Sequence, residues 1–316
     1  MRRHVAVEDR VGAHAVLADD DHMRRQTLRG SHRRYAEQAC EEGSHHNTIL
    51  AYSPRVLNER ETKRQIAELS RHAYERGYIG PGDGNISCKL SEGRIAVTPS
   101  GMHKGRLREE DIIIVDAGGK KLSGKGNKTS EYLMHELCYE ERPDIGAVVH
   151  AHPKFATALA LAGVSLAQCI LSESCITLGS IVTAPYSTPT TEEVPNTLRP
   201  LLRCTNAIIM NRHGALTLGR TLQEAYDRLE IVEHSAQITH AARCIAPVDP
   251  LPEHEVKKLQ DIARAFGIPA PPETCEVCNA CPNGKGGPIK LGAPGVADPE
   301  TEQIVAAVLK RISASS

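Results

Sequence analysis

Between residues 58 and 267, apolar residues follow two alternating spacings, one typical of strands and the other typical of helices. Short runs rich in β-branched residues predict strands at 94–98, 112–115, 147–150, 181–184, 207–210 and 215–218. Apolar residues three and four positions apart predict helices at 59–76, 130–141, 154–161, 192–203, 222–242 and 250–267. Strands and helices mixed in this way favour a layered α/β or α+β domain.

Two of these helices carry especially clear signals. The helix at 59–76 has Asn58 as a candidate N-cap and Gly77 as a candidate residue just beyond its C-terminal end. The helix at 222–242 places Ala225, Leu229, Val232 and Ala236 on one stripe. Both helices are therefore expected to pack one face against the sheet.

The two ends of the chain lack this order. Residues 1–46 have no periodicity and few large apolar side chains, which predicts a disordered extension, although a misplaced translation start would look the same. Residues 268–297 are rich in Cys, Gly and Pro and predict a flexible linker. Residues 298–316 predict an amphipathic helix with Val305 and Leu309 on its apolar face.

Composition narrows the functional class. The 316 residues carry a formal net charge of −1, so no excess of positive charge indicates binding to nucleic acid or to an anionic membrane. No apolar run reaches the roughly 18 residues of a membrane span, and the N-terminus lacks a secretory apolar region. Ten cysteines without an export signal suggest reduced thiols in the cytoplasm. With no Trp and two Phe, the core is expected to be aliphatic.

Three histidines form the sharpest chemical signal. His150 and His152 stand two positions apart at the end of a predicted strand, so both imidazoles are expected on one face of the sheet. His213 follows a second predicted strand, and strand ends can converge at one edge of a sheet. Three histidines with an open position are a ligand set that zinc accepts. The alternative is that these are only polar residues at strand ends.

Two further features suggest a polar site, although each has an ordinary explanation. Glu131 stands at the start of a predicted helix, behind the candidate N-caps Thr129 and Ser130, where an acid commonly complements the helix dipole. Small-residue turns at 82–87, at 98–101 and at Thr129–Ser130 offer backbone and side-chain donors for an anion. Each turn alone is an everyday feature, but together they suggest an anion-binding cradle.

Five segments in order resemble the class II aldolase/adducin family. They are Gly84-Asn85-Ile86-Ser87, Thr98-Pro99-Ser100-Gly101, Ser130-Glu131, 148–153 and Arg212-His213-Gly214-Ala215. The resemblance runs from about residue 59 to 242 and is strongest to the members that cleave fuculose phosphate. It implies a catalytic domain over 58–267, built as a three-layer α/β/α sandwich around a mainly antiparallel sheet. It also implies a homotetramer with active sites at subunit interfaces.

The same resemblance implies the chemistry. His150, His152 and His213 correspond to ligands of a catalytic Zn²⁺, and Glu131 to the acid/base residue, which also binds the resting metal. The substrate phosphate would be bound by Gly84, Asn85, Ser100, Gly101, Thr129 and Ser130. The implied reaction is cleavage of a ketose 1-phosphate, such as L-fuculose 1-phosphate, into dihydroxyacetone phosphate and L-lactaldehyde.

One departure from the family pattern leaves other activities open. Leu171 and Phe266 stand where the fuculose-phosphate enzymes have tyrosines that protonate the aldehyde oxygen, and Glu173 and Tyr186 are nearby candidates for that task. The family also contains sugar-phosphate epimerases and a dehydratase. Its adducin-type scaffolding members lack the metal histidines, all three of which are present in this chain.

The C-terminal tail suggests two further hypotheses. Cys275, Cys278 and Cys281 have the spacing of metal or cluster ligands but lack a fourth ligand, so free thiols in a mobile linker are the simpler interpretation. The helix at 298–316 either docks on its own domain or, behind its linker, resembles an encapsulation peptide. The second case predicts shell proteins as partners and localisation inside a bacterial microcompartment.

Overall fold

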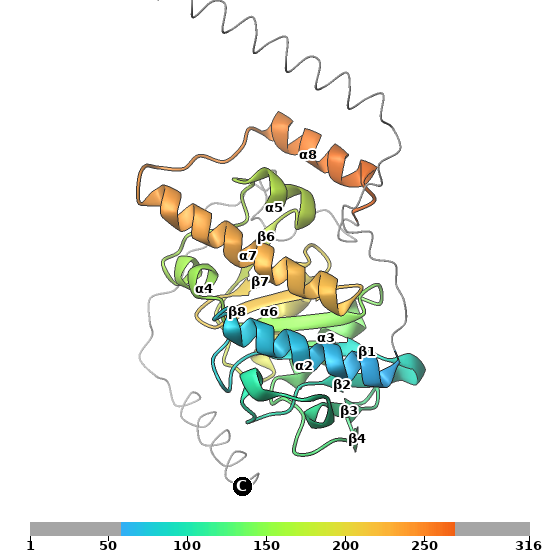
Figure 1. Ribbon diagram of the computed structural model, residues 1–316. Helices are drawn as coiled ribbons and strands as arrows, with labels where there is room; N and C mark the ends of the chain where they lie inside the picture. The colour runs from blue at the N-terminus through green and yellow to red at the C-terminus, as the bar shows by residue number, and fades with distance from the viewer. Residues whose placement is uncertain (1–57, 269–316) are drawn as a thin grey trace, which may run out of the picture. The chain divides into compact units, whose positions relative to one another are not determined.

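The computed structural model describes residues 58–268, which form one eight-stranded sheet flanked by helices (Figure 1). The strands are β1 (Asn85–Lys89), β2 (Ile95–Val97), β3 (Ile113–Val115), β4 (Lys121–Ser123), β5 (Ala147–Ala151), β6 (Ile181–Ala184), β7 (Ala207–Met210) and β8 (Gly214–Gly219). The helices are α2 (Glu59–Glu75), α3 (Tyr132–Glu141), α4 (Lys154–Leu161), α5 (Ser172–Thr177), α6 (Glu193–Leu202), α7 (Leu222–Arg243) and α8 (Glu253–Ala265). The predicted extension, linker and terminal helix lie outside the described residues.

The sheet is mainly antiparallel, as expected. Its strand order is β4-β3-β2-β1-β5-β8-β7-β6, and only the β6–β7 pair is parallel. In the centre, β5 pairs with β1 on one side and with β8 on the other. These central strands bring together segments that are up to about 130 residues apart in the sequence, and they carry the polar residues discussed below.

Helices cover both faces of the sheet and make the three predicted layers. One core contains apolar residues of α2, α4 and α7, including Ile66 and Leu229, packed against strand residues such as Val149 and Ile209. The other core lies beneath α3 and α6 and contains Val148 and Leu216. Val148 and Val149 enter opposite cores because successive strand residues point to opposite faces. The buried core is largely aliphatic, as the composition predicts.

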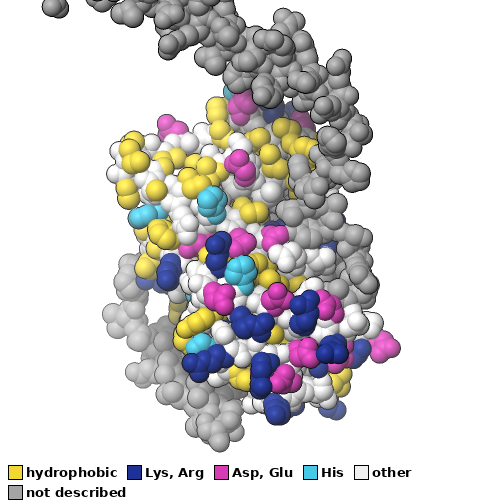
Figure 2. Space-filling model, viewed as in Figure 1, with side chains coloured by type: hydrophobic (Ala, Val, Ile, Leu, Met, Phe, Trp, Pro, Cys, Tyr) yellow, Lys and Arg dark blue, Asp and Glu magenta, His cyan; other side chains and the backbone are white. Residues whose placement is uncertain are grey.

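Local signals explain where the principal helices start and end. The Asn58 side chain accepts a hydrogen bond from the Glu61 backbone nitrogen at 2.9 Å, and Gly77 beyond the helix has a φ of +71°, which confirms both predicted ends of α2. Figure 2 shows charged side chains of both signs over α2, in agreement with ion pairs such as Lys63–Glu59. Along residues 58–268, no helix is both long and apolar enough to cross a membrane.

Three short elements escape the prediction. Residues 82–87 are expected to form a turn, but β1 already begins at Asn85. Asn85 and Ser87 are polar yet buried, so this strand lacks the apolar pattern by which a strand is predicted. The edge strand β4 is exposed along its whole length and carries no burial pattern at all. Helix α5 has only six residues, too few for a clear helical period.

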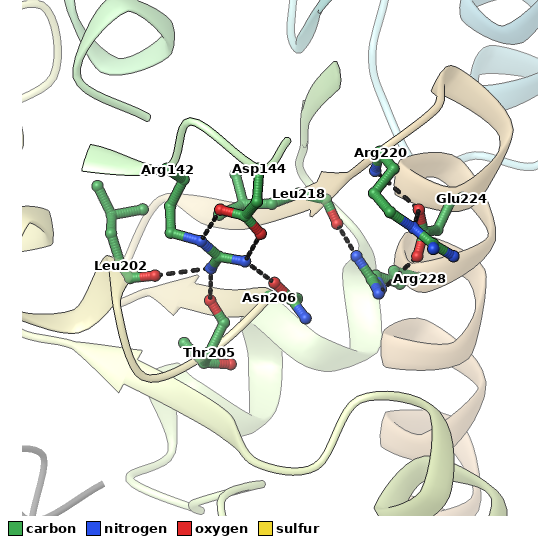
Figure 3. A network of polar contacts seen from close by, with 9 residues as sticks. All are labelled: Arg142, Asp144, Leu202, Thr205, Asn206, Leu218, Arg220, Glu224 and Arg228. Atoms are coloured by element: carbon green, nitrogen blue, oxygen red, sulfur yellow. Dashed lines mark hydrogen bonds and ion pairs between the residues drawn. The ribbon is translucent and has the colours of Figure 1, made fainter. Parts of the chain in front are cut away.

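Two buried arginines tie loops to the sheet (Figure 3). Arg142 follows α3 and donates to the Asp144 carboxylate, to the Leu202 and Thr205 carbonyls and to the Asn206 side chain, at 2.8–3.2 Å. Arg228 of α7 donates to Glu224 at 2.8 Å and to the Leu218 carbonyl of β8. Both guanidinium groups are therefore hydrogen-bonded where burial would otherwise penalise their charge.

Candidate metal centre

Three histidines meet where the central strand β5 ends and its neighbour β8 begins. His150 lies in β5, His152 follows that strand, and His213 lies in the tight turn between β7 and β8. Arg212 has a φ of +61° in this turn, and the Ala151–Ala215 pairing of β5 with β8 holds the two segments together. The predicted convergence of the strand-end histidines is confirmed.

The three rings present their nitrogens to a common point. Their centroids are 4.8–5.0 Å apart, and one nitrogen from each ring lies within 4.8 Å of the other two. The Nε2 atoms of His150 and His152 are 3.0 Å apart. Two ring nitrogens this close require at least one bare lone pair facing the other ring, which is the arrangement that a shared cation would stabilise.

The protonation of the rings suits a metal. Burial lowers the pKa values of His150 and His152 to about 4, so both imidazoles are neutral at pH 7. The His150 Nδ1–H group donates to the Ala215 carbonyl at 3.0 Å, which leaves the lone pair on Nε2. A neutral imidazole whose tautomer is fixed, such as His150, is a good ligand for a divalent transition metal, and the cluster therefore fits one.

The carboxylate of Glu131 also lies against two of these rings. One carboxylate oxygen lies 3.1 Å from His213 Nε2, and the other lies 3.4 Å from His150 Nε2. Burial would raise the pKa of this carboxyl, but His150, His213 and a hydrogen bond from Asn85 outweigh it and hold the pKa well below its usual range. The carboxylate is therefore ionised and adjacent to two of the three histidines that could hold a cation.

The start of α3 differs from the prediction in one respect. Thr129 and Ser130 are candidate N-caps, but the helix begins at Tyr132 and the cap position belongs to Glu131, whose side chain makes no capping bond. The Thr129 hydroxyl accepts a hydrogen bond from the Glu131 backbone nitrogen at 3.3 Å. The Glu131 carboxylate thus turns to the histidines and is not an ordinary partner of the helix dipole.

The small-residue turns also come together beside the cluster. The Ser100 nitrogen donates to the Asn127 carbonyl at 2.9 Å, and the Thr129 nitrogen donates to the Thr98 carbonyl at 3.2 Å, so the two turns lie side by side. Ser100, Gly101 and Ser130 are exposed there, whereas Thr129 is buried. Gly84 precedes β1, where a side chain would press against the backbone of His150. Thr129 contacts the backbone of Glu131 and Gly84 lies against that of His150, so these turns adjoin two residues of the cluster.

A buried lysine that sequence analysis missed holds two of these turns. Lys104 is almost fully buried, and its ammonium group donates to the carbonyls of Met102 at 3.1 Å and Pro99 at 3.3 Å and approaches that of Gly82 at 3.5 Å. Burial lowers its pKa. No sequence pattern distinguishes it from the surface lysines nearby, because its partners are backbone oxygens set by the fold.

The residues at the family's tyrosine positions lie at the ends of α5 and α8. Leu171 is the N-cap of α5, Glu173 lies in its first turn, and Phe266 is the C-cap of α8. Tyr186 and Phe266 are exposed, with 55% and 43% of their surface accessible. Within residues 58–268 of a single chain, none of them has a hydrogen bond or ring contact with the histidines.

Comparison with known proteins connects this geometry to a family. Residues 64–240, more than half of the chain, match the family described as the Class II Aldolase and Adducin N-terminal domain. The chain belongs to the class II aldolase and adducin family. Its class II aldolases are metal-dependent, and the three histidines of the cluster lie inside the matched region.

Individual relatives carry out more than one reaction. An L-fuculose phosphate aldolase from Methanococcus vannielii is 33% identical over 177 residues, covering 56% of this chain and 94% of the relative. A 3-oxo-tetronate 4-phosphate decarboxylase from Haemophilus influenzae is 29% identical over 180 residues, covering 56% of this chain and 85% of the relative. The solved L-fuculose-1-phosphate aldolase of Thermus thermophilus has a TM-score of 0.53 at 28% identity, covering 61% of this chain and 100% of that chain. Family membership therefore establishes the fold, and the three-histidine cluster could bind the metal on which class II aldolases depend, but the individual reaction is not fixed by either.

Proposed function

We propose that the protein is a zinc-dependent aldolase that cleaves a ketose 1-phosphate, such as L-fuculose 1-phosphate, into dihydroxyacetone phosphate and L-lactaldehyde. The observation that carries this proposal is the convergence of His150, His152 and His213 on one point that an ionised carboxylate, Glu131, also faces. Three nitrogen ligands leave room for substrate oxygens on a bound metal.

The proposed chemistry divides between the metal and Glu131. When bound, Zn²⁺ would act as a Lewis acid toward substrate oxygens and stabilise the negative charge that develops as the carbon–carbon bond breaks. In cleavage, Glu131 would take up a proton from solvent and deliver it to the carbon of the dihydroxyacetone phosphate half at which that bond was broken. In the reverse direction, the ionised carboxylate would remove that proton. The 2.7 Å hydrogen bond from Asn85 keeps the carboxylate directed toward that position.

The substrate phosphate would occupy the cradle formed by Gly84, Asn85, Ser100, Gly101, Thr129 and Ser130. Two observations support this role. The turns at 98–101 and 127–130 are joined by backbone hydrogen bonds, and the exposed Ser100 and Ser130 hydroxyls are available to a ligand. Asn85 uses one of its two N–H groups on Glu131 and has a second for a phosphate oxygen. A phosphate in this position would lie next to the metal and the base.

Decarboxylation is the second candidate reaction. The Haemophilus influenzae relative is named as a decarboxylase of a sugar-acid phosphate. Loss of carbon dioxide from a 3-oxo acid leaves an enolate, as aldol cleavage does. One metal and one acid could therefore serve both reactions. An epimerase or a dehydratase would use the same site. A scaffold without catalysis is disfavoured because the histidines and Glu131 are assembled.

Assembly and location complete the proposal. A homotetramer would place the active site at a subunit interface, where Glu173 and Tyr186 of a neighbouring chain could supply the proton for the aldehyde oxygen. Large exposed apolar residues such as Ile245 and Ile262 favour burial against another chain. Figure 2 shows such side chains gathered over the part of the surface near α5 and α8. The helix at 298–316 is proposed to direct the enzyme to microcompartment shell proteins.

A substrate panel tests the proposed reaction. Purified protein reconstituted with Zn²⁺ would be assayed with L-fuculose 1-phosphate, L-rhamnulose 1-phosphate and 3-oxo-tetronate 4-phosphate. Release of dihydroxyacetone phosphate is followed for the two ketoses, and release of carbon dioxide for the acid. Metal-dependent cleavage of a ketose 1-phosphate is the expected result. Carbon dioxide release without cleavage of either ketose would assign the protein to the decarboxylases.

A further inference from the structure

A chain of buried polar side chains runs from Glu131 into the layer between the sheet and α3. The Asn85 side-chain nitrogen donates to the Glu131 carboxylate at 2.7 Å, and the Asn85 side-chain oxygen contacts Nε2 of His135. On its other side, Nδ1 of His135 lies 2.7 Å from the Ser87 hydroxyl, which in turn lies 2.7 Å from the Tyr139 hydroxyl. Nothing in the proposed chemistry uses the last three residues.

The spacing of these residues joins one strand to one helix. Asn85 and Ser87 are two positions apart on β1 and therefore share a face of the sheet. His135 and Tyr139 are four positions apart on α3, in register with Glu131 just before that helix, and therefore form one stripe. Asn85, Ser87, His135 and Tyr139 are all buried, the His135 ring completely. These four side chains thus form a polar contact between β1 and α3 inside an otherwise apolar layer.

Only one assignment of hydrogen-bond donors and acceptors satisfies every side chain in this row. An ionised carboxylate can only accept, so Asn85 must present its N–H to Glu131 and its oxygen to His135. His135 must then carry its proton on Nε2 and accept at Nδ1, and the Ser87 hydroxyl supplies that hydrogen. Tyr139 finally donates to the Ser87 oxygen. Burial lowers the pKa of His135 to about 4, in agreement with one neutral tautomer at pH 7.

We infer that His135, held in one tautomer by Ser87 and Tyr139, is a positioning residue that fixes the orientation of the Asn85 amide. With the opposite orientation, the Asn85 oxygen would face the Glu131 carboxylate and repel it. The orientation set by His135 directs the amide nitrogen of Asn85 toward the base, Glu131, and its oxygen away from it. This inference rests on the proposed function, since it assigns His135 an effect on the same site.

Three variants separate this role from a general contribution to folding. His135→Leu removes the donor, and His135→Gln keeps an N–H group near the Nε2 position without a titrating ring. Cys138→Ala is the matched control, because Cys138 is buried on the same helix but packs in the apolar cluster beneath α3. The measurements are bound Zn²⁺ per chain, kcat and KM for the cleaved ketose 1-phosphate, and proton exchange at dihydroxyacetone phosphate.

The inference predicts that His135→Leu keeps one Zn²⁺ per chain while kcat/KM and the exchange rate fall by about tenfold to a hundredfold. His135→Gln should recover most of that loss, and Cys138→Ala should match the unmodified protein. The inference is overturned if His135→Gln is as impaired as His135→Leu, or if activity falls only in proportion to lost metal.

A spectroscopic measurement tests the same inference without any substrate. In ¹⁵N–¹H spectra of histidine-labelled protein, the His135 ring is identified by its absence from the His135→Gln spectrum. The ring should be neutral and protonated at Nε2. A proton on Nδ1 in the unmodified protein would refute the chain of donation. If the ring behaves as expected but no sugar phosphate is cleaved, the proposed function fails and the orientation of Asn85 stands.

Discussion

Gly84→Ala is the smallest change that tests the packing of β1 against the metal centre. Gly84 has a φ of +66°, in the left-handed region that only glycine enters freely. An added methyl group would lie 2.5 Å from Cγ2 of Ile79 and 2.9 Å from the carbonyl oxygen of His150. The Ile79 side chain can rotate, but the His150 carbonyl belongs to the central strand β5 and has little freedom to move.

The expected cost follows from two contributions. The left-handed backbone costs an alanine about 1–2 kcal/mol relative to glycine. Forcing a methyl group into a filled space costs about 1–3 kcal/mol more. The smaller entropy of the unfolded chain returns about 0.4–1 kcal/mol. The free energy of unfolding should therefore fall by about 1–5 kcal/mol, and β1 should move away from β5 at the Asn85–His150 pair.

Two other glycines in the same region supply matched controls. Gly101 has a φ of +69° but no atom within 4 Å of an added methyl group, so Gly101→Ala should lose only about 1 kcal/mol. Gly82 lies outside the left-handed region and also has open space, so Gly82→Ala should be neutral or slightly stabilising. Denaturant unfolding of the metal-free proteins gives all three values. Equal stability of Gly84→Ala and Gly82→Ala would refute the packing described here.

Three more predictions concern the base, the cradle and pH. Glu131→Gln keeps the shape of the side chain but cannot take a proton, so turnover should fall roughly 10²–10⁴-fold while Zn²⁺ is largely retained; unchanged proton exchange at dihydroxyacetone phosphate would contradict this role. Ser130→Ala should raise KM for a phosphorylated substrate roughly 10- to 150-fold, the equivalent of about 1.5–3 kcal/mol, and equal activity on the unphosphorylated sugar would exclude a phosphate site. Because the pKa of His135 falls from 6.5 to about 4 on folding, the unfolded chain binds an extra proton between these pH values. Stability should therefore drop by up to about 3 kcal/mol as pH falls from 6.5 to 4, and His135→Gln should show a smaller drop in denaturant titrations.

The sequence predicts the frame of this protein well because its central strands and long helices bury regular apolar patterns. The helix at 154–161 and the strands at 181–184 and 207–210 coincide with α4, β6 and β7. Where burial is polar, the pattern fails, as at β1, whose Asn85 and Ser87 face α3 and not an apolar core. The start of β1 is predicted as a turn because polar residues are ordinarily exposed, whereas those of β1 are buried.

The same limit applies to the candidate site. His150 and His152 could be found because two histidines at strand spacing are rare and their geometry is local. His135 and Lys104 were missed because their roles depend on partners 50 residues away or on backbone carbonyls. One local signal for His135 does exist in the chain, namely the spacing of Glu131, His135 and Tyr139, which places three polar groups on one side of a helix.

The most direct test of the proposed function is a titration of metal-free protein with Zn²⁺, following bound metal and cleavage of the ketose 1-phosphate in the same samples. The proposal predicts that cleavage rises in proportion to bound Zn²⁺ and stops rising at one ion per chain. His213→Ala, which removes one of the three converging nitrogens, should bind Zn²⁺ weakly and show little cleavage. Full cleavage without bound metal, or full metal binding and turnover in His213→Ala, would contradict the central claim.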